Sequence, residues 1–434
     1  MKLLFILILT SCTFISHAQI LKKIADKTKQ KTEQKISDKI SNKVSDAVSA
    51  PIDEATIDKK ESNKKSDTKS QSNVPTSVKN ENSKKSLSTY SKYDFVPGDK
   101  IIFYEDFSQD NIGDFPDKWN TNASAELVKI DGEAGKWLQI NKKGKLFPES
   151  IKNLPENFTL EFDLICNDGF SYYSRPLSFM LLSGGASNKE FEYSFIGYTK
   201  RSGVVFDLHP HNAASNGGSV HIDTYEDGKR IITNDVITKQ FNSENENNKV
   251  RVSIWRQKNR IRIYLNEEKV FDLPRAFAAG KDYNFAMFEL DGNMSRDNDK
   301  YLVSNIKLAI GAPDTRNKLI TEGKFVTTGI LFDVNSDKIQ PSSFGVLKDI
   351  ALVLKENATV KIKIVGHTDS DGDDNANMEL SKKRAAAVKD ALIKEFDISA
   401  NRIETDGMGE KKPVSNNNSP EEKANNRRVE FIKL

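Results

Sequence analysis

Gly366-His367-Thr368-Asp369, with Arg384 fifteen residues after the aspartate, is the stretch that most constrains this chain of 434 residues. The aspartate ends an apolar stretch, and the arginine falls in the first turns of the helix expected next. Facing each other across a shallow pocket, the two suit a zwitterion, because the acid can hold an ammonium group and the planar arginine can take a carboxylate by two parallel hydrogen bonds. A solvated surface pair of the same residues would contribute only roughly 0 to 1 kcal/mol. The surrounding sequence has to decide between these interpretations.

The C-terminal part of the chain carries a series of motifs around this pair. They are Gly329-Ile330-Leu331-Phe332-Asp333 with Ser336 and Ile339-Gln340-Pro341-Ser342, the Thr368-Asp369 turn to Gly372 with Asn377, Leu380 and Ser381, Asp406-Gly407-Met408-Gly409-Glu410 with Pro413, and Asn426-Arg427-Arg428-Val429-Glu430-Phe431. With these motifs in order, residues 320–434 resemble the OmpA-like peptidoglycan-binding domain, the C-terminal domain of the outer-membrane protein A family.

The resemblance implies a ligand and a role for particular residues. In that family an aspartate and an arginine grip the amine and the carboxylate of the diaminopimelate side chain in the peptidoglycan stem peptide. Carried over to this sequence, the two roles fall to Asp369 and Arg384, with Thr368, Asn377 and Arg427 as supporting contacts.

The hydrophobic pattern of this region independently favours an α/β sandwich. A short strand is predicted over 328–334, followed by an amphipathic helix that opens at Pro341 and carries apolar residues at Phe344, Leu347, Ile350, Leu352 and Leu354. A half-buried strand over 360–364, an alanine-rich second helix, and strands near 402–406 and 428–433 follow. The acid and the arginine would then lie where a strand ends and a helix begins, so that open N–H groups and the helix dipole favour a ligand carboxylate.

The acidic run Asp369-Ser370-Asp371-Gly372-Asp373-Asp374 also admits interpretation as a calcium loop. An EF-hand loop beginning at Asp369 would need glutamate at its twelfth position, which is Leu380, and glycine at its sixth, which is Asp374. We therefore predict no metal and no cofactor, and expect the extra acids to strengthen the attraction for a cationic amine.

The start of the chain predicts export. Lys2 precedes an apolar run, and Ser16-His17-Ala18 forms a small-residue cleavage pattern, so residues 1–18 are expected to be a signal peptide. Leu9-Thr10-Ser11-Cys12 also fits a bacterial lipobox, which would place a lipid on Cys12, but ending the signal at Ser11 leaves a short apolar core. No later run approaches the roughly 20 apolar residues needed to span a membrane.

The next two segments are strongly basic. Residues 20–92 hold 17 lysines against 10 acidic residues, although the whole chain carries a formal charge of only +3. Over residues 19–52, apolar residues and threonine recur every fourth position, which predicts an amphipathic helix that is either simply solvated or self-associates or lies on an anionic surface. Residues 53–92 are rich in Lys, Ser and Asn and bury too little apolar surface to fold, so we expect a disordered linker.

Residues 93–312 show the alternation of an antiparallel β-sandwich. The predicted strands cover 101–104, 137–140, 158–166, 177–182, 193–198, 204–208, 250–255, 260–265, 283–290 and 303–310. The opening Glu105-Asp106-Phe107 with Phe115-Pro116 and Trp119, and the closing Val303-Ser304-Asn305-Ile306-Lys307-Leu308-Ala309, resemble the concanavalin-like jelly roll of lectins and laminin G modules. A membrane barrel is the alternative, but its strands would need about ten residues.

Two patterns in this region resemble an enzyme site and a metal site. Glucanases of this fold carry Glu-x-Asp-x-x-Glu, whereas Glu161-Phe162-Asp163-Leu164-Ile165-Cys166 has cysteine in the last place, which argues against hydrolysis. Asp207, His209, His211, His221 and Asp223 form a local cluster, but His209 and His211 flank a proline and lack a convincing third ligand.

Together these patterns predict a multidomain protein in which an all-β jelly-roll sandwich is followed by an α/β OmpA-like sandwich, after a helical and disordered N-terminal segment. The expected function is non-catalytic, as an envelope protein of the periplasm or outer membrane of a Gram-negative bacterium, anchored to peptidoglycan. The outer membrane or a glycan is a candidate partner of the β-sandwich, and no nucleic acid is expected. The alternative is a periplasmic carbohydrate-active enzyme, or a lectin, retained at the wall by the same domain.

Overall fold

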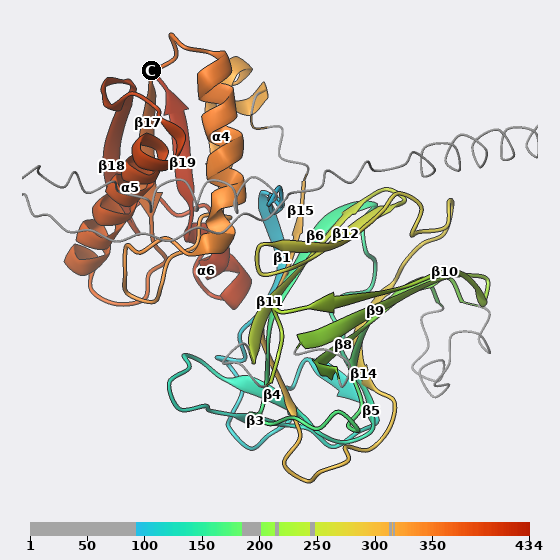
Figure 1. The fold of residues 1–434 in the computed structure, drawn as a ribbon. Coiled ribbons are helices and arrows are strands. Elements are labelled where there is room, and N and C mark those ends of the chain that lie inside the picture. Colours follow the sequence, from blue (N-terminus) through green and yellow to red (C-terminus); the bar gives the residue numbers. More distant parts are fainter. Residues whose placement is uncertain (1–92, 185–200, 213–216, 244–247, 312–314, 316) are drawn as a thin grey trace, which may run out of the picture. The chain divides into compact units, whose positions relative to one another are not determined.

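The computed structural model of the chain describes residues 93–184, 201–212, 217–243, 248–311, 315 and 317–434 (Figure 1). The predicted signal peptide, lipobox, amphipathic helix and linker lie outside the described residues, as does the predicted strand over 193–198. Those predictions stay predictions, and the fold below is that of the described ranges.

Residues 100–310 form two antiparallel sheets within the described part of the chain. The first has the order β13 (Glu268–Leu273), β12 (Arg260–Leu265), β11 (Lys249–Gln257), β6 (Asn157–Cys166), β15 (Tyr301–Ile310), β4 (Trp137–Ile140) and β3 (Glu126–Val128), with β1 (Lys100–Glu105) also paired to β15. The second has the order β10 (Lys229–Thr238), β9 (Gly217–Glu226), β8 (Gly203–Asn212), β7 (Leu177–Leu182), β14 (Phe285–Leu290), β5 (Gly144–Pro148) and β2 (Trp119–Thr121).

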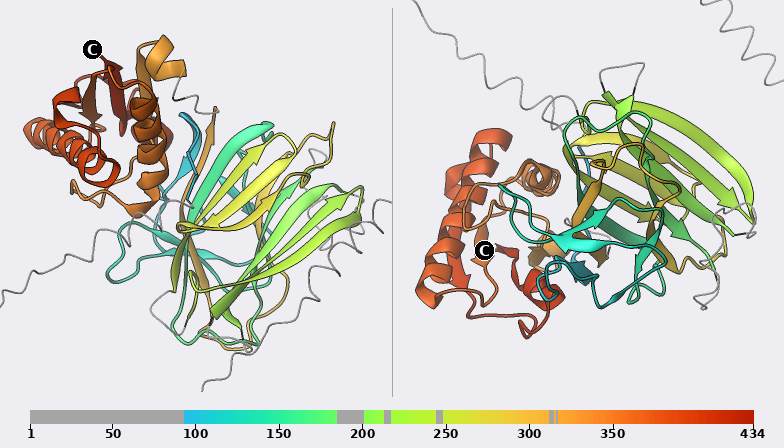
Figure 2. Two further views of the ribbon diagram at one scale, coloured as in Figure 1. Left: turned by 45° about the horizontal axis from the view of Figure 1, so that its top comes forward. Right: turned by 90° about the horizontal axis from the view of Figure 1, so that it is seen from below.

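One hydrophobic core fills the space between the two sheets. Period-two alternation turns every second side chain of β6 inward, and the ring of Phe162 lies 5.1 Å from both Phe179 on β7 and Phe288 on β14. The sheets face one another across this layer (Figure 2). The two-sheet prediction and the strands predicted in the described ranges are confirmed, while the likeness to a concanavalin-like jelly roll stays a prediction.

The C-terminal part pairs helices with a third sheet. Its strands have the order β16 (Lys324–Thr327), β19 (Val429–Lys433), β17 (Ile362–His367) and β18 (Ile403–Gly409), with β17 and β18 parallel. Three α-helices accompany them in the described residues: α4 (Phe344–Glu356), α5 (Asp374–Phe396) and α6 (Pro420–Asn426). Short helical turns cover Asn317–Thr321, Pro341–Ser343 and Ala400–Arg402.

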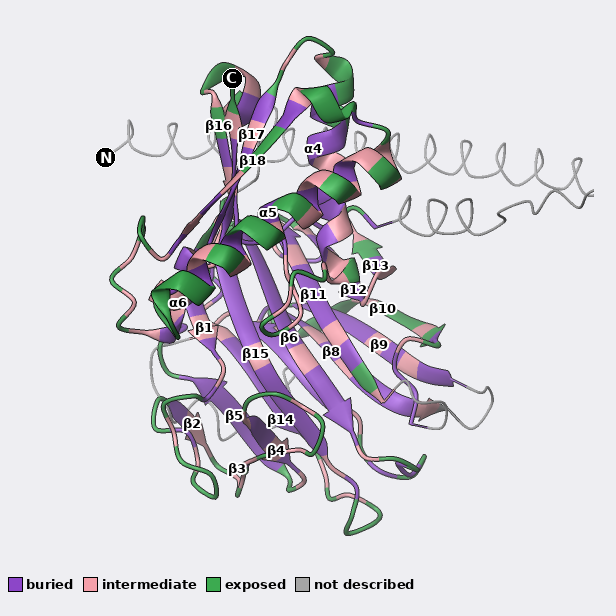
Figure 3. Cartoon of the chain, turned by 90° about the vertical axis from the view of Figure 1, so that its left-hand side faces the viewer, coloured by how far each residue is buried: buried purple, intermediate pink, exposed green. Residues whose placement is uncertain are grey.

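Most of the predicted elements of this region are confirmed, with two exceptions. The strand predicted over 328–334 is wrong, because only an isolated bridge joins Phe332 to Ile339 there, and the edge strand lies earlier, at β16. Leu352 was predicted on the apolar face of α4 but is exposed. In α5 the buried positions are Asn377, Ser381, Ala385, Val388 and Leu392, so one stripe faces the sheet and the opposite side faces solvent (Figure 3).

Candidate functional site

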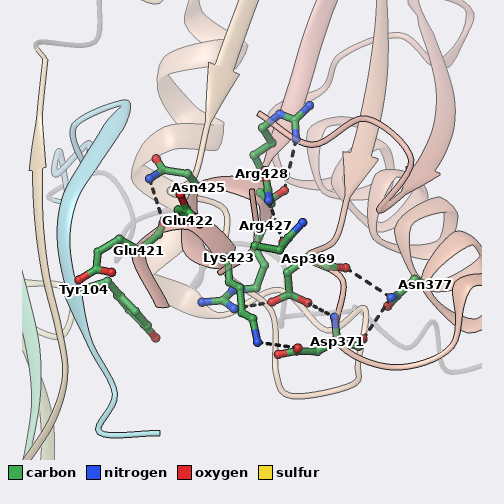
Figure 4. A network of polar contacts seen from close by, with 12 residues as sticks. Tyr104, Asp369, Asp371, Asn377, Glu421, Glu422, Lys423, Asn425, Arg427 and Arg428 are labelled. Carbon is green, nitrogen blue, oxygen red and sulfur yellow. Dashed lines mark hydrogen bonds and ion pairs between the residues drawn. The ribbon is translucent and has the colours of Figure 1, made fainter. Parts of the chain in front are cut away.

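Asp369 lies just beyond the carboxyl end of β17, as predicted, and its carboxylate is almost fully buried. One oxygen, Oδ2, is 2.5 Å from Nη1 of Arg427, and the other, Oδ1, accepts the backbone N–H of Asp371 at 3.2 Å (Figure 4). A carboxylate has about four lone-pair positions, so these two contacts leave room for a further donor.

The loop after Asp369 is organised by Asn377 and Asp373. The amide nitrogen of Asn377 donates to the backbone oxygens of Asp369 and Asp371, at 3.4 and 3.1 Å, and to Oε2 of Glu410 at 2.7 Å. Asp373 is the N-cap of α5, and its carboxylate accepts the N–H groups of residues 375 and 376. The N–H groups of residues 375 and 376, which were expected to be open to a ligand carboxylate, are therefore already occupied by Asp373.

Arg384 lies farther along α5 than predicted. It follows Asp374, the first residue of α5, by ten positions, about three helical turns, so it is beyond the first turn to which the helix dipole extends. Its Nε donates to the backbone oxygen of Ser336 at 2.9 Å, and its guanidinium lies 4.9 Å from the ring centre of Phe332. Among the described residues no hydrogen bond occupies its two terminal nitrogens, so the forked end of the guanidinium remains available.

Two glycines explain why α5 carries Arg384 to this place. A Cβ on Gly366 of β17 would lie 2.3 Å from the backbone oxygen of Ser381, and one on Gly407 of β18 would lie 2.4 Å from the backbone nitrogen of Lys382. Only glycine lets the helix lie this close to the strands. Ser381 is fully buried at this contact, and its hydroxyl accepts the N–H of Gly409 at 2.9 Å.

Thr368, which was predicted as a supporting contact, directly follows β17. Its backbone N–H donates to the backbone oxygen of Gly409 at 3.0 Å. Its side chain is buried, with 4% exposed, yet its hydroxyl has no hydrogen-bond partner among the described residues. A buried hydroxyl left unpaired is costly, so a ligand group that met it would gain a ready partner.

The charged side chains of the site change the pKa values of Arg384 and Arg427. Burial lowers the pKa of Arg384, the Asp369 carboxylate raises it and Arg427 lowers it. For Arg427, burial would lower the pKa, but Tyr104 and Asp369 outweigh burial and raise it. Because arginine stays protonated in either case, the site holds two cations around one anion. The structure thus brings Asp369, Arg427 and Arg384 into one electrostatic group, and a ligand that carries both charges can complement it.

A charged cluster that the sequence did not predict surrounds Glu430 on β19, the strand that pairs with β17. Glu430 on β19 accepts two hydrogen bonds from Arg428, at 3.0 and 2.8 Å, and contacts Lys324 at 2.8 Å and His367 at 3.5 Å. Burial would raise the pKa of Glu430, but these donors hold it well below the usual range. The alternation of β19 could have indicated that Glu430 faces inward, but not which residues surround it.

In the β-sandwich, the carboxylates of the glucanase-like pattern are paired with cations of the protein itself. Glu161 is buried and contacts Lys307 at 2.6 Å and Arg251 at 3.3 Å, and Arg251 also binds Asp163 at 2.8 Å. Burial would raise the pKa of Glu161, but the two cations lower it, which is the opposite of what a general acid needs.

The histidine cluster is likewise divided between protein partners. His209 contacts the backbone oxygen of Ser174 at 3.0 Å, whereas His221 lies between Asp235 at 2.8 Å and Asp223 at 3.4 Å. Within the described ranges no group of three or more His, Cys, Asp or Glu side chains is arranged to hold a metal. Over the same ranges, none of the helices has the length and apolar character of a membrane span.

Comparisons with known proteins point to the C-terminal region. The sequence model of the OmpA family matches residues 331–427. The chain is 41% identical over 102 residues to YiaD, a probable lipoprotein of Escherichia coli (strain K12), and the match covers 24% of this chain and 46% of YiaD. It is 34% identical over 107 residues to YfiB of the same strain, covering 25% of this chain and 67% of YfiB. Other similar proteins are named as outer membrane proteins and an outer-membrane lipoprotein.

The crystal structure of the peptidoglycan-associated lipoprotein from Burkholderia pseudomallei is also similar. It is 27% identical, with a TM-score of 0.24, and the match covers 28% of this chain and 98% of that one. The chain spans less than half of the length of YiaD, so nothing about that whole protein carries over directly.

Proposed function

The chain belongs to the OmpA family through its C-terminal region, and from this premise we propose that residues 320–434 anchor the protein to peptidoglycan by binding the diaminopimelate of the stem peptide. Asp369 takes the ammonium group of that side chain, and the forked end of Arg384 takes its carboxylate. Thr368, Asn377 and Arg427 support the contact: the first by its unpaired hydroxyl, the second by holding the loop, and the third by its pair with Asp369.

The observation that carries this proposal is the incomplete partnering of Asp369 and Arg384. Each side chain is fixed on one side, Asp369 by Arg427 and Arg384 by the backbone of Ser336 and the ring of Phe332. Each also retains unused hydrogen-bonding capacity. Pre-fixed charged groups with free donors and acceptors lose little conformational entropy when a zwitterionic group arrives.

We further propose that the protein works in the envelope of a Gram-negative bacterium, exported by the signal peptide predicted over residues 1–18, in the periplasm or at the outer membrane. Its β-sandwich is non-catalytic in this proposal. The support is the state of Glu161, which is closed in by Lys307 and Arg251 and has no unpaired carboxylate partner for glycoside hydrolysis.

The test of the anchor is co-sedimentation of the full-length protein with purified sacculi. Losing one partner of a desolvated charge pair costs about 2 to 5 kcal/mol, and each 1.4 kcal/mol is tenfold in affinity. Asp369→Ala and Arg384→Ala should therefore each weaken binding by roughly thirtyfold or more. Arg384→Lys should also bind poorly, because lysine keeps the charge but cannot form the fork.

Lys383→Ala is the matched control for this test. Lys383 is the exposed neighbour of Arg384 on α5, so its loss removes the same net charge without touching the site. We expect this variant to pellet like the parent. If Asp369→Ala and Arg384→Ala also pellet like the parent while remaining folded, the site is not the anchor.

A further inference from the structure

The first strand of the β-sandwich contacts residues 320–434, the proposed anchor, close to the Asp369 site. Strand β1 pairs with β15 along one edge. At its other edge, the side-chain amide of Asn425 on α6 forms hydrogen bonds with the backbone N–H and C=O of Ile101. The N–H of Ile101 donates to Oδ1 of Asn425 at 3.1 Å, and Nδ2 of Asn425 donates to the Ile101 carbonyl at 3.1 Å. Ile101, Ala309 and Ala424 pack together at the same contact. The anchor helix thus covers an otherwise open sheet edge.

Two glycines make the fit close. A Cβ on Gly345 of α4 would lie 2.3 Å from the backbone oxygen of Phe95, and one on Gly329 would lie 2.5 Å from the ring of Pro97. The segment that leads into β1 therefore lies directly against the anchor region, and its Val96 belongs to the anchor's hydrophobic core.

Tyr104 lies on β1 at the edge of the anchor site. The guanidinium of Arg427 is 5.6 Å from the centre of its ring, so Arg427 stands between Tyr104 on one side and Asp369 on the other (Figure 4). A cation at this distance over a tyrosine face is attracted by it. The only contact between Arg427 and Asp369 is through Nη1, although a guanidinium and a carboxylate prefer two parallel bonds when both can turn freely.

The ring of Tyr104 is held by polar residues on the outer face of the β6–β15 sheet. The Tyr104 hydroxyl donates to Oδ1 of Asn305 at 3.3 Å, and Nδ2 of Asn305 donates to Oδ2 of Asp163 at 2.7 Å. Asn305 adopts a left-handed backbone with φ 53°, where the register between β15 and β6 shifts. The polar chain therefore runs from Asp369 through Arg427 and Tyr104 to the charged network of the sandwich.

We propose that Tyr104 is a positioning residue of the peptidoglycan site, supplied by the preceding β-sandwich. Its ring holds the guanidinium of Arg427 in an orientation that gives Asp369 one bond and leaves the rest of the carboxylate for the ligand's ammonium group. Without the ring, Arg427 is free to take Asp369 by both of its forked nitrogens and to compete with the ligand. This inference rests on the proposed function, and it makes the anchor site a joint product of two domains.

The test compares full-length variants in binding to purified sacculi. Tyr104→Leu should weaken binding roughly three- to tenfold, the range expected for a cation–π contact. Tyr104→Phe keeps the ring but loses the hydroxyl's bond to Asn305, so it should lose less binding than Tyr104→Leu. Tyr173→Leu removes an exposed tyrosine of the same domain and is the matched control.

A double-mutant cycle separates positioning from a general effect on folding. If Tyr104 acts through Arg427, then Tyr104→Leu should weaken binding in the parent but add nothing in the Arg427→Ala background. Equal losses in both backgrounds, or equal losses for Tyr104→Phe and Tyr104→Leu, would overturn the inference. So would parental binding of Tyr104→Leu while Asp369→Ala loses binding. If Asp369→Ala binds like the parent, the proposed function fails, and the inference that rests on it fails as well.

Discussion

Two charged groups of the molecule, one around Glu161 in the β-sandwich and one around Asp369 in the C-terminal region, differ in how far their members are paired. In the sandwich, Glu161 has Lys307 on one side and Arg251 on the other, and Arg251 has Asp163 as well, so every charge in the group has an opposite partner. In the anchor, Asp369 has one arginine, and Arg384 has one backbone carbonyl and one ring face. A group of buried charges that is fully paired within the protein supports the fold, whereas a group with unused hydrogen-bonding capacity is where we expect a ligand.

The largest expected effect is on the fully paired group around Glu161. Glu161→Ala leaves Lys307 and Arg251 without their shared carboxylate, and breaking a buried pair in this way costs about 3 to 5 kcal/mol of folding free energy. All three tryptophans, Trp119, Trp137 and Trp255, lie in the sandwich, so urea unfolding followed by tryptophan fluorescence reports on this region. Binding of the folded variant to sacculi should be unchanged.

A matched control for this experiment is Glu133→Ala. Glu133 pairs with Lys249, and both side chains are partly exposed, so its loss should cost no more than about 1 kcal/mol. A cost for Glu161→Ala as small as that of the control would contradict the view that the charged group holds the sandwich together.

The second effect is an opposite pH dependence of the two regions. Burial raises the pKa of Glu105 in the sandwich to about 7, even though the N–H groups of Phe107 and Trp119 donate to its carboxylate. A raised pKa stabilises the fold below the ordinary value of 4.5 and loses that contribution as pH rises through about 7. Glu430 in the anchor has a depressed pKa, so its contribution is present above 4.5 and is lost only as pH falls.

This difference can be measured by tryptophan-detected unfolding between pH 5 and 7. We expect Glu105 to lower the stability of the sandwich by up to about 1.4 kcal/mol per pH unit in that window. Glu105→Gln removes one titrating group and should make the profile less steep without flattening it, because burial also raises the pKa of Glu289 on β14 to about 7. Glu430→Gln should leave this part of the profile unchanged. A parental profile that does not change with Glu105→Gln would show that another group is responsible.

The smallest effect concerns an ion pair beside the group around Asp369. Lys423 lies 2.7 Å from Asp371 in the loop after Asp369, but the Asp371 side chain is 64% exposed. Exposed pairs contribute about 0 to 1 kcal/mol, so Lys423→Ala should change both thermal stability and binding to sacculi only slightly. A loss of binding as large as that of Asp369→Ala would place Lys423 in the site.

The sequence predicted the helices and strands whose apolar residues recur at a regular spacing. Helix α5 and strands β17, β18 and β19 follow from their periodic apolar residues, and Asp369 was placed correctly at the end of β17. The strand predicted over 328–334 failed because an apolar run does not tell a paired strand from an extended segment. Strand β10 was not predicted, because it lies at a sheet edge and most of its residues are exposed, so it shows little alternation.

Within the site, the sequence named the charged residues but not their pairing. Arg427 was predicted as a supporting contact, and the structure makes it the direct partner of Asp369. Tyr104 was missed because it lies more than three hundred positions before Arg427, and no local pattern links a residue of β1 to α6 and the turn after it. Such contacts are decided by how whole elements pack, which spacing along the chain does not encode.

In the proposed function, Arg384 binds the carboxylate that distinguishes diaminopimelate from lysine in a stem peptide. The most direct test is calorimetric titration of the full-length protein with two matched muropeptides, one with diaminopimelate and one with lysine at the third position. We expect the parent to bind the diaminopimelate form at least roughly thirtyfold more tightly, since the lysine form leaves Arg384 unpaired. Arg384→Ala should bind both forms equally and weakly. Equal binding of the two forms by the parent would show that Arg384 does not bind this carboxylate.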